Sequence, residues 1–157
     1  MNHGTFGFSN YLVSSGGFIN DPSTVRFIEY KWFRGGDFFL FTHPLYTFQS
    51  LPETFASPEP FVMVNGIHHF EGFFLQRIPI IRRLKLSTAI GGAMLTIPSN
   101  KLMHIESYAG LERKFKMWDA PTRLGLYYSV LPLDIHPGFR VKFGMDFKDT
   151  FTDRWNF

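Results

Sequence analysis

The strictest pattern in this chain lies near its C-terminal end. Residues 139–148 read FRVKFGMDFK, so apolar and polar residues alternate one by one, apart from a glycine at 144. In an extended strand, alternate side chains point to opposite faces of the sheet. One face is therefore apolar, with Phe139, Val141, Phe143, Met145 and Phe147. The other face carries the charges of Arg140, Lys142, Asp146 and Lys148. The pattern predicts a β-strand with one apolar and one charged face.

Such a strand fits two kinds of protein. In a soluble sheet the apolar face belongs to the core, whereas in a transmembrane barrel it faces lipid along about 9–11 tilted residues. Alternation alone does not separate the two, because exchanging the faces leaves the pattern unchanged. Five large apolar residues on one face, followed by an aromatic residue at Phe157, favour the membrane barrel.

The composition predicts an all-β fold and excludes several other classes. The chain has 157 residues with 20 Phe, 14 Gly and 10 Pro, which are residues of strands and turns. There is no Cys, so there is neither a disulfide nor a thiolate site. No run of 18 apolar residues predicts a transmembrane helix. The net charge of +3 comes from scattered basic residues, so we expect no nucleic-acid partner.

Alternating segments recur along the chain and predict about eight antiparallel strands in a meander. The expected strands are 5–13, 24–34, 38–49, 61–75, 86–97, 103–112, 122–130 and a last one from 139. The expected connections include a Pro-rich loop at 50–60, a basic turn at 77–85 and turns at 98–101 and 113–121. Residues 1–157 would then be a single C-terminal barrel segment.

Polar side chains on two of these strands suggest a cluster inside the barrel. His69 and Glu71 share one strand face, and His104 and Glu106 share another. All four would project into the lumen, which is the barrel interior, together with the charges of the last strand. Hydrogen bonding in the lumen is the default role for such a cluster, and a metal site would need three or more converging ligands. We expect no metal, no cofactor and no catalytic residue.

A basic turn is expected on the periplasmic side. It contains Arg77, Arg82, Arg83 and Lys85, and the assignment counts strands back from a periplasmic C-terminus. These cations could bind anionic lipid headgroups or a partner protein. They could equally be a solvated turn whose charges suit the end of a short helix.

A longer stretch resembles a known family. The run HHFEGFFLQRIPIIRRLKL at 68–86, preceded by LYTFQSLPETF and followed by HIESYAGLERKFK, resembles the C-terminal barrel of an uncharacterised outer-membrane family of Bacteroidetes-type bacteria. The resemblance covers roughly 38–157. It implies a signal peptide and a carboxypeptidase-regulatory-like β-sandwich ahead of a large barrel, and neither is in this chain. It implies a location and a fold, and no reaction.

The first functional hypothesis is therefore a non-catalytic component of a bacterial outer-membrane β-barrel, with a transport, assembly or structural role. Because residues 1–4 do not resemble a signal peptide, we expect a fragment whose strands close against missing N-terminal strands. Its other partners would be outer-membrane lipid and the barrel-assembly machinery. The resemblance implies that the machinery reads the terminal signal at Trp155 and Phe157. The alternative is a soluble β-barrel that binds an apolar ligand inside. An enzyme is the weakest hypothesis, because no nucleophile elbow, phosphate loop or metal spacing occurs.

Overall fold

The structure is a computed structural model of the chain. It describes residues 3, 6–18, 24–35, 44–51, 54–70, 75, 83–117, 120–130 and 139–147. Of residues 117, 120, 121 and 139–147 it describes the backbone alone.

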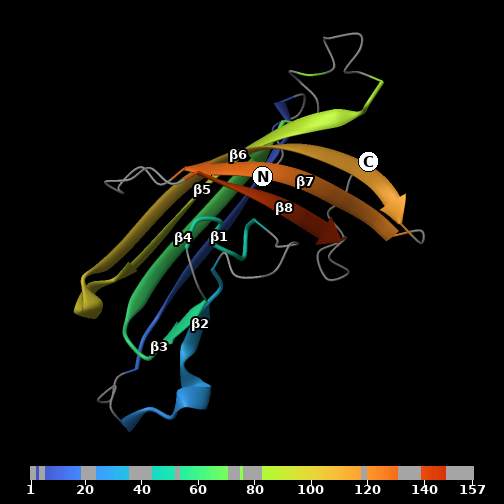
Figure 1. Cartoon of the computed structure of the whole chain (residues 1–157). Coiled ribbons are helices and arrows are strands. Elements are labelled where there is room, and N and C mark those ends of the chain that lie inside the picture. The colour runs from blue at the N-terminus through green and yellow to red at the C-terminus, as the bar shows by residue number, and fades with distance from the viewer. Residues whose placement is uncertain are drawn as a thin grey trace.

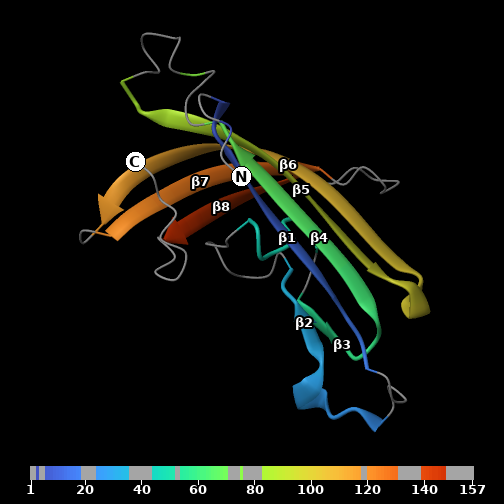
Figure 2. The same cartoon turned by 180° about the vertical axis from the view of Figure 1, so that it is seen from behind.

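Six strands form one antiparallel sheet in the order β1-β4-β5-β6-β7-β8. They are β1 (Phe8–Gly16), β4 (Phe61–His69), β5 (Leu86–Ile97), β6 (Leu102–Met117), β7 (Ala120–Val130) and β8 (Phe139–Phe147). Their lengths run from 9 residues in β1, β4 and β8 to 16 in β6. Figures 1 and 2 show the sheet as a twisted arch. Its edges are β1 and β8, which do not pair with each other within the described residues, so no closed barrel is found there.

A second sheet lies under the arch. It is a two-stranded antiparallel pair of β2 (Lys31–Phe33) and β3 (Phe55–Ser57). A short 3₁₀ turn, η3 (Phe27–Glu29), precedes β2, and another, η5 (Pro98–Asn100), joins β5 to β6. Both views place β2, β3 and part of the chain between them on the concave side of the large sheet (Figures 1 and 2). In the described part of the chain, no helix is both long and apolar enough to cross a membrane.

The predicted all-β antiparallel class is confirmed, and so are several elements. The strand at 86–97 and the turn that follows it are found where the alternation places them. The single meander is wrong, because β2 and β3 pair with each other outside the six-stranded sheet. Of the segment expected as a strand at 24–34, only Lys31–Phe33 is extended in a ladder, and the expected loop at 50–60 contains β3.

One expected turn and one expected strand are also corrected. The turn at 113–121 is wrong, since β6 continues to Met117 and β7 begins at Ala120. Its charged residues alternate with Phe115 and Met117, so they continue the strand rather than end it. The described part of the strand expected at 38–49 is also wrong. Residues 44–51 form turns and bends instead, and the backbone N–H groups of Gln49 and Ser50 donate to the side chain of Glu106 rather than to a neighbouring strand.

The core lies between the arch and the chain beneath it. A cluster of buried residues joins the large sheet to the underlying segments: Phe33, Phe48, Leu51, Phe61, Met63, Ala93, Leu95 and Ile97. A smaller cluster contains Leu45, Ile67, Ala89, Tyr108 and Tyr127. At the end of the sheet near the β5–β6 turn, the concave face is therefore covered by the chain's own side chains.

Candidate functional site

The pleat divides the large sheet into two faces that differ in the charged residues they carry. The inner face is the concave one and carries the odd residues of β4, β5 and β7 and the even residues of β6. The outer face carries the alternate set together with Tyr11 and Val13 of β1. Among the described outer-face residues of β1 and β4 to β7, Arg113 is the one Asp, Glu, Lys or Arg. The buried charges lie on the inner face.

The carboxylate of Glu112 is the centre of one polar group on the inner face, called here the Glu112 network. Glu112 is only 1% exposed. Its Oε2 lies 2.7 Å from Nδ1 of His69, and its Oε1 accepts the hydroxyl of Tyr127. Nη1 of Arg123 lies 3.6 Å from the same Oε2. A buried carboxylate needs such donors and a counter-charge, because leaving it alone in an apolar surrounding is costly.

The ring of Phe8 packs against two members of this network, Arg123 and His69. The guanidinium of Arg123 lies over the ring of Phe8, with its Cζ 5.1 Å from the ring centroid. The same ring stacks on His69 at a centroid distance of 4.7 Å. Nη1 of Arg123 also lies 2.6 Å from Nδ1 of His69. One ring nitrogen cannot donate to Glu112 and accept from Arg123 at once, so these two hydrogen bonds are alternatives.

Two tyrosines of the inner face lie across glycines on the neighbouring strand. Tyr127 is directly opposite Gly110, and Tyr108 is directly opposite Gly91. A Cβ at either glycine would overlap the tyrosine ring. The absence of a glycine side chain therefore lets each ring lie flat along the sheet, which brings the Tyr127 hydroxyl to Glu112.

Residues 44–51, called here the inserted segment, lie against the middle of the inner face. Glu106, which is 2% exposed, accepts the backbone N–H of Gln49 at 2.6 Å through Oε1 and that of Ser50 at 2.7 Å through Oε2. Nε2 of His104 lies 3.1 Å from Oε2 of Glu106. The Ser50 hydroxyl donates to that of Ser129 at 2.7 Å. One buried carboxylate thus replaces a strand partner for two backbone donors.

The first half of the inserted segment is also fixed by side chains of the sheet. The side-chain amide of Asn65 donates to the carbonyl oxygen of Leu45 at 2.8 Å. The hydroxyl of Tyr108 donates to the carbonyl oxygen of Pro44 at 3.3 Å. Three strands, β4, β6 and β7, therefore hold the segment against the concave face. The inner face therefore fixes a peptide segment by hydrogen bonds and holds a buried carboxylate, Glu112, beside a buried guanidinium, Arg123.

Comparison with protein families gives one result. A family described as "Family of unknown function (DUF5686) C-terminal domain" matches residues 1–111. The chain belongs to this family. No curated protein and no solved structure matches the chain.

The family match and the resemblance seen in the sequence differ in extent. The match covers residues 1–111, whereas the resemblance runs from 38 to the end. His69, His104 and Glu106 of this DUF5686 C-terminal domain lie inside the matched range, and Glu112, Arg123 and Tyr127 follow it.

The described members of the predicted polar cluster all lie on the inner face, in two groups. His104 and Glu106 contact each other beside the inserted segment, whereas His69 belongs to the Glu112 network. Glu106 pairs in register with Ala93, and Ala93 pairs with Asn65 of β4. Asn65 and His69 are four residues apart on β4, so the two groups are separated by about 13 Å along the strand. Glu71 lies outside the described residues. Within the described part of the chain, no three His, Cys, Asp or Glu side chains lie close enough to hold a metal ion.

The other predicted residues are placed as follows. In the backbone register, Arg140 pairs with Ser129, Lys142 with Tyr127 and Asp146 with Arg123. Arg83 and Lys85 are exposed in a turn that precedes β5, and Lys85 has a positive φ of 50°. Lys148, Arg77, Arg82, Trp155 and Phe157 lie outside the described residues.

The sequence patterns did not lead to a prediction of Glu112 and Arg123 as inner-face site residues of this DUF5686 domain. Glu112 has the same strand parity as Glu106, and Arg123 stands on the polar side of its strand, so alternation carried a signal for both. No local signal pointed to Gln49 and Ser50, because their bonds to Glu106 join segments 57 and 56 residues apart.

Proposed function

We propose that this DUF5686 C-terminal domain is part of the wall of a bacterial outer-membrane β-barrel, with a transport, assembly or structural role and no reaction of its own. The observation that carries the proposal is the polarity of the sheet. Its exposed outer face is apolar apart from a few small polar residues, His68 and the single charge of Arg113, whereas Glu106, Glu112 and Arg123 are buried on the inner face. A barrel in lipid requires this arrangement, whereas a soluble barrel has the reverse.

Exposure supports the polarity argument. Large apolar side chains on the outer face stand open: Tyr11 is 64% exposed, Val13 69% and Ile90 54%. Tyr11 and Val13 lie on β1 and Ile90 on β5, and β4, which lies between these two strands, adds the outer-face residue Val62, itself 40% exposed. A soluble monomer rarely exposes an apolar patch of this kind, whereas lipid covers it at no cost.

Strand length supports the proposal independently. Each of the six strands in the large sheet has 9 residues or more. About 9–11 residues suffice for a tilted strand to cross a bilayer. In such a barrel the sheet edges at β1 and β8 would pair with further strands, because unpaired backbone groups are expensive in hydrocarbon.

The inner face does not favour the alternative, a soluble barrel with an apolar ligand inside. At one end it is filled by the chain's own Phe33, Phe48 and Leu51. At the other end it holds the buried charges of Glu112 and Arg123. An apolar ligand would have to displace the first set or lie against the second, and both are costly.

The finer parts of the proposal rest on the resemblance seen in the sequence. We propose a Bacteroidetes-type bacterium as the source, with a signal peptide and a β-sandwich in the complete protein. The turn at Arg83 and Lys85 would face the periplasm. The end of the chain at Trp155 and Phe157 would be captured by the assembly machinery through strand addition.

Cell fractionation tests the proposal. The chain is expressed behind a bacterial export signal and its recovery in detergent-extracted outer membrane is measured. We expect Phe157→Ala to reduce that recovery several-fold and Phe157→Tyr, the matched aromatic control, to retain it. Recovery of a monomeric protein that folds cooperatively in plain buffer would overturn the membrane proposal and favour the soluble barrel.

A further inference from the structure

An apolar groove crosses the outer face at the centre of the sheet, and it is called here the outer groove. Its volume is about 580 Å³, which lies in the range of sites that bind small organic molecules. Its lining includes Ile90 from β5, Leu111 from β6 and Leu126 and Tyr128 from β7. Ala109 pairs with Ile90 on one side and Tyr128 on the other, so a small side chain stands between two large ones.

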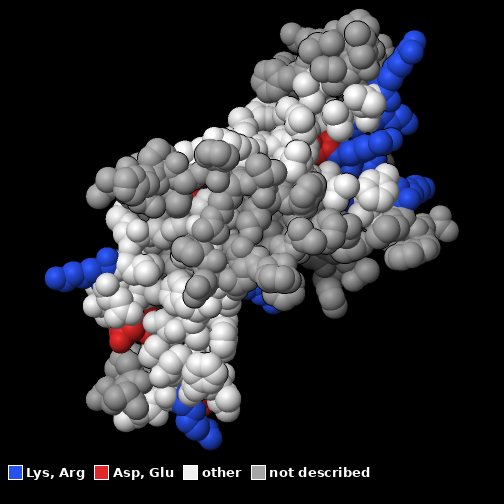
Figure 3. All heavy atoms as spheres, in the orientation of Figure 1, with Lys and Arg blue, Asp and Glu red and all other residues white. Residues whose placement is uncertain are grey.

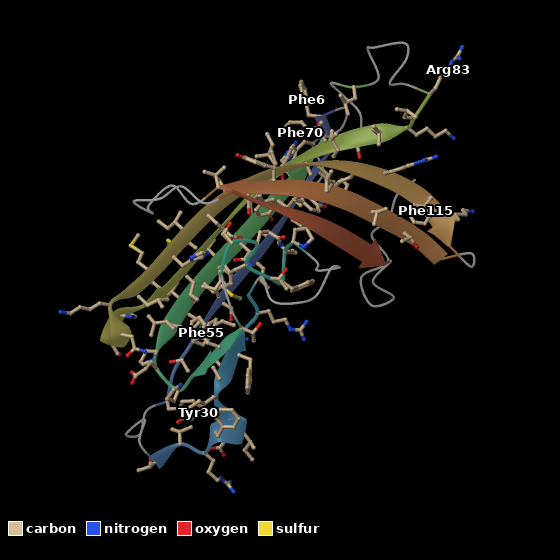
Figure 4. All side chains as sticks on the ribbon, in the orientation of Figure 1. Phe6, Tyr30, Phe55, Phe70, Arg83 and Phe115 are labelled. Atoms are coloured by element: carbon tan, nitrogen blue, oxygen red, sulfur yellow. The ribbon has the colours of Figure 1, made fainter. Side chains whose placement is uncertain are left out.

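Exposed cations stand at one end of this groove, called here the basic end. Arg113 follows Leu111 by two residues on the same face of β6, about 7 Å along the strand. It pairs in register with Leu86, directly after the exposed turn with Arg83 and Lys85. Arg113 forms no ion pair with any described residue. Figure 3, which shows the concave side, has blue atoms at this end of the molecule, and Figure 4 labels Arg83 in the turn there.

We infer that the outer groove and the basic end together form a binding site for one anionic phospholipid. An acyl chain lies between Ile90, Leu111 and Tyr128, and the phosphate is bound by Arg113 with Lys85 beside it. Apolar and cationic parts follow one another along the strand direction, which is the direction in which a lipid extends in a bilayer. A phosphate accepts hydrogen bonds from a guanidinium in a bidentate manner, so Arg113 suits the headgroup.

This site rests on the proposed membrane location and adds a specific ligand class to it. General contact with lipid requires only an apolar face. The groove and the cations beside it predict a preference between headgroups, because a zwitterionic lipid offers no net charge to the basic end.

The test counts bound lipid on the chain purified from outer membranes in mild detergent. Short-chain phosphatidylglycerol or phosphatidylcholine is titrated, and retained lipids are counted by native mass spectrometry. We expect about a fivefold preference for phosphatidylglycerol, the size expected from about one cationic side chain near an anionic headgroup. Arg113→Gln should abolish most of it. Lys101→Gln is the matched control, because this exposed lysine lies in the turn at the other end of the β5–β6 hairpin.

The groove is tested separately from the headgroup. Ala109→Leu should fill the groove and reduce retention of both lipids several-fold. Ser107→Leu is its control, since Ser107 lies on the same face of β6 and does not line the groove. Unequal effects of these two substitutions distinguish binding in the groove from non-specific lipid binding anywhere on the apolar face.

Four outcomes would overturn the inference. The headgroup preference could be missing in the unchanged chain, or Arg113→Gln and Lys101→Gln could act alike. Ala109→Leu and Ser107→Leu could also act alike. Inorganic phosphate at constant ionic strength could displace phosphatidylglycerol, which would identify a free-anion site. If the chain is recovered from the outer membrane and gives any of these results, the lipid site is excluded and the membrane proposal stands. A chain that is soluble in plain buffer removes the membrane proposal and this site with it.

Discussion

The carboxylate of Glu106 accepts the backbone N–H of Gln49 at 2.6 Å, although 57 positions separate the two residues in the chain. Its second oxygen accepts the N–H of the next residue, Ser50. The inserted segment therefore depends on a single side chain for two of its backbone hydrogen bonds. Because the carboxylate and both donors are buried, neither side of this contact has water as a replacement.

Glu106→Gln should loosen the inserted segment while the sheet remains folded. The amide keeps one acceptor oxygen and turns an NH₂ group toward a backbone donor, at a cost of about 1–3 kcal/mol. Urea unfolding of the detergent-folded chain and the rate of proteolysis within residues 44–51 measure the effect. Glu59→Gln, in the loop before β4, is the control for loss of a carboxylate. Equal proteolysis rates in the two variants would show that Glu106 does not hold the segment.

Gly91→Ala should destabilise the sheet through Tyr108 alone. All three atoms nearest to a Cβ at this position belong to the Tyr108 side chain, two ring carbons and the hydroxyl oxygen, so the ring must move, at a cost of about 1–3 kcal/mol. In a Tyr108→Ala background the same substitution should be nearly neutral. A double-mutant cycle on the free energy of unfolding measures this coupling. Additive losses from the two substitutions would mean that the ring does not lie over the glycine.

Glu112→Met should be among the most damaging single substitutions on the inner face. It removes the acceptor of His69 and Tyr127 and the carboxylate nearest to the buried Arg123 in the described structure. Removing one partner of a buried ion pair costs about 3–5 kcal/mol. The double variant Glu112→Met/Arg123→Met should lose less than the sum of its two single variants. Urea unfolding midpoints check this, and strict additivity would exclude a charge contact between the pair.

A charge introduced on the outer face should be tolerated at its end and not at its centre. Ile90→Arg places a cation in the middle of the apolar face and should cost about 2–4 kcal/mol in a bilayer, whereas Met103→Arg, near the Lys101 turn, should cost at most about 1 kcal/mol. Unfolding of the chain in lipid vesicles measures both. Because each residue is more than half exposed, a soluble sheet would accept both substitutions equally well.

Much of the fold could be predicted because it follows from local alternation. Leu86–Ile97 is a strand over the range that its pattern indicates, and the parity of β4 and β6 places His69, His104 and Glu106 together on one face. Strand parity is a property of each residue and its neighbours, so it is readable without tertiary structure. The error at 113–121 arose where charged residues were interpreted as a turn although their alternation with Phe115 and Met117 continued.

Three features were decided only by the tertiary structure. Alternation states that two faces differ, but which one is covered depends on the segments that fold beneath the sheet, such as the one containing Phe48. The inserted segment takes its shape from hydrogen bonds to Glu106, Asn65 and Ser129, which no local pattern encodes. The pairing of His69 with Glu112 joins β4 to β6, two strands that are not neighbours in the sheet. The sequence by itself determined strands and their two-sided polarity, because these depend on the pleat. Contacts between distant segments determined which face is buried and which charges meet, because those depend on how the whole chain closes over the sheet.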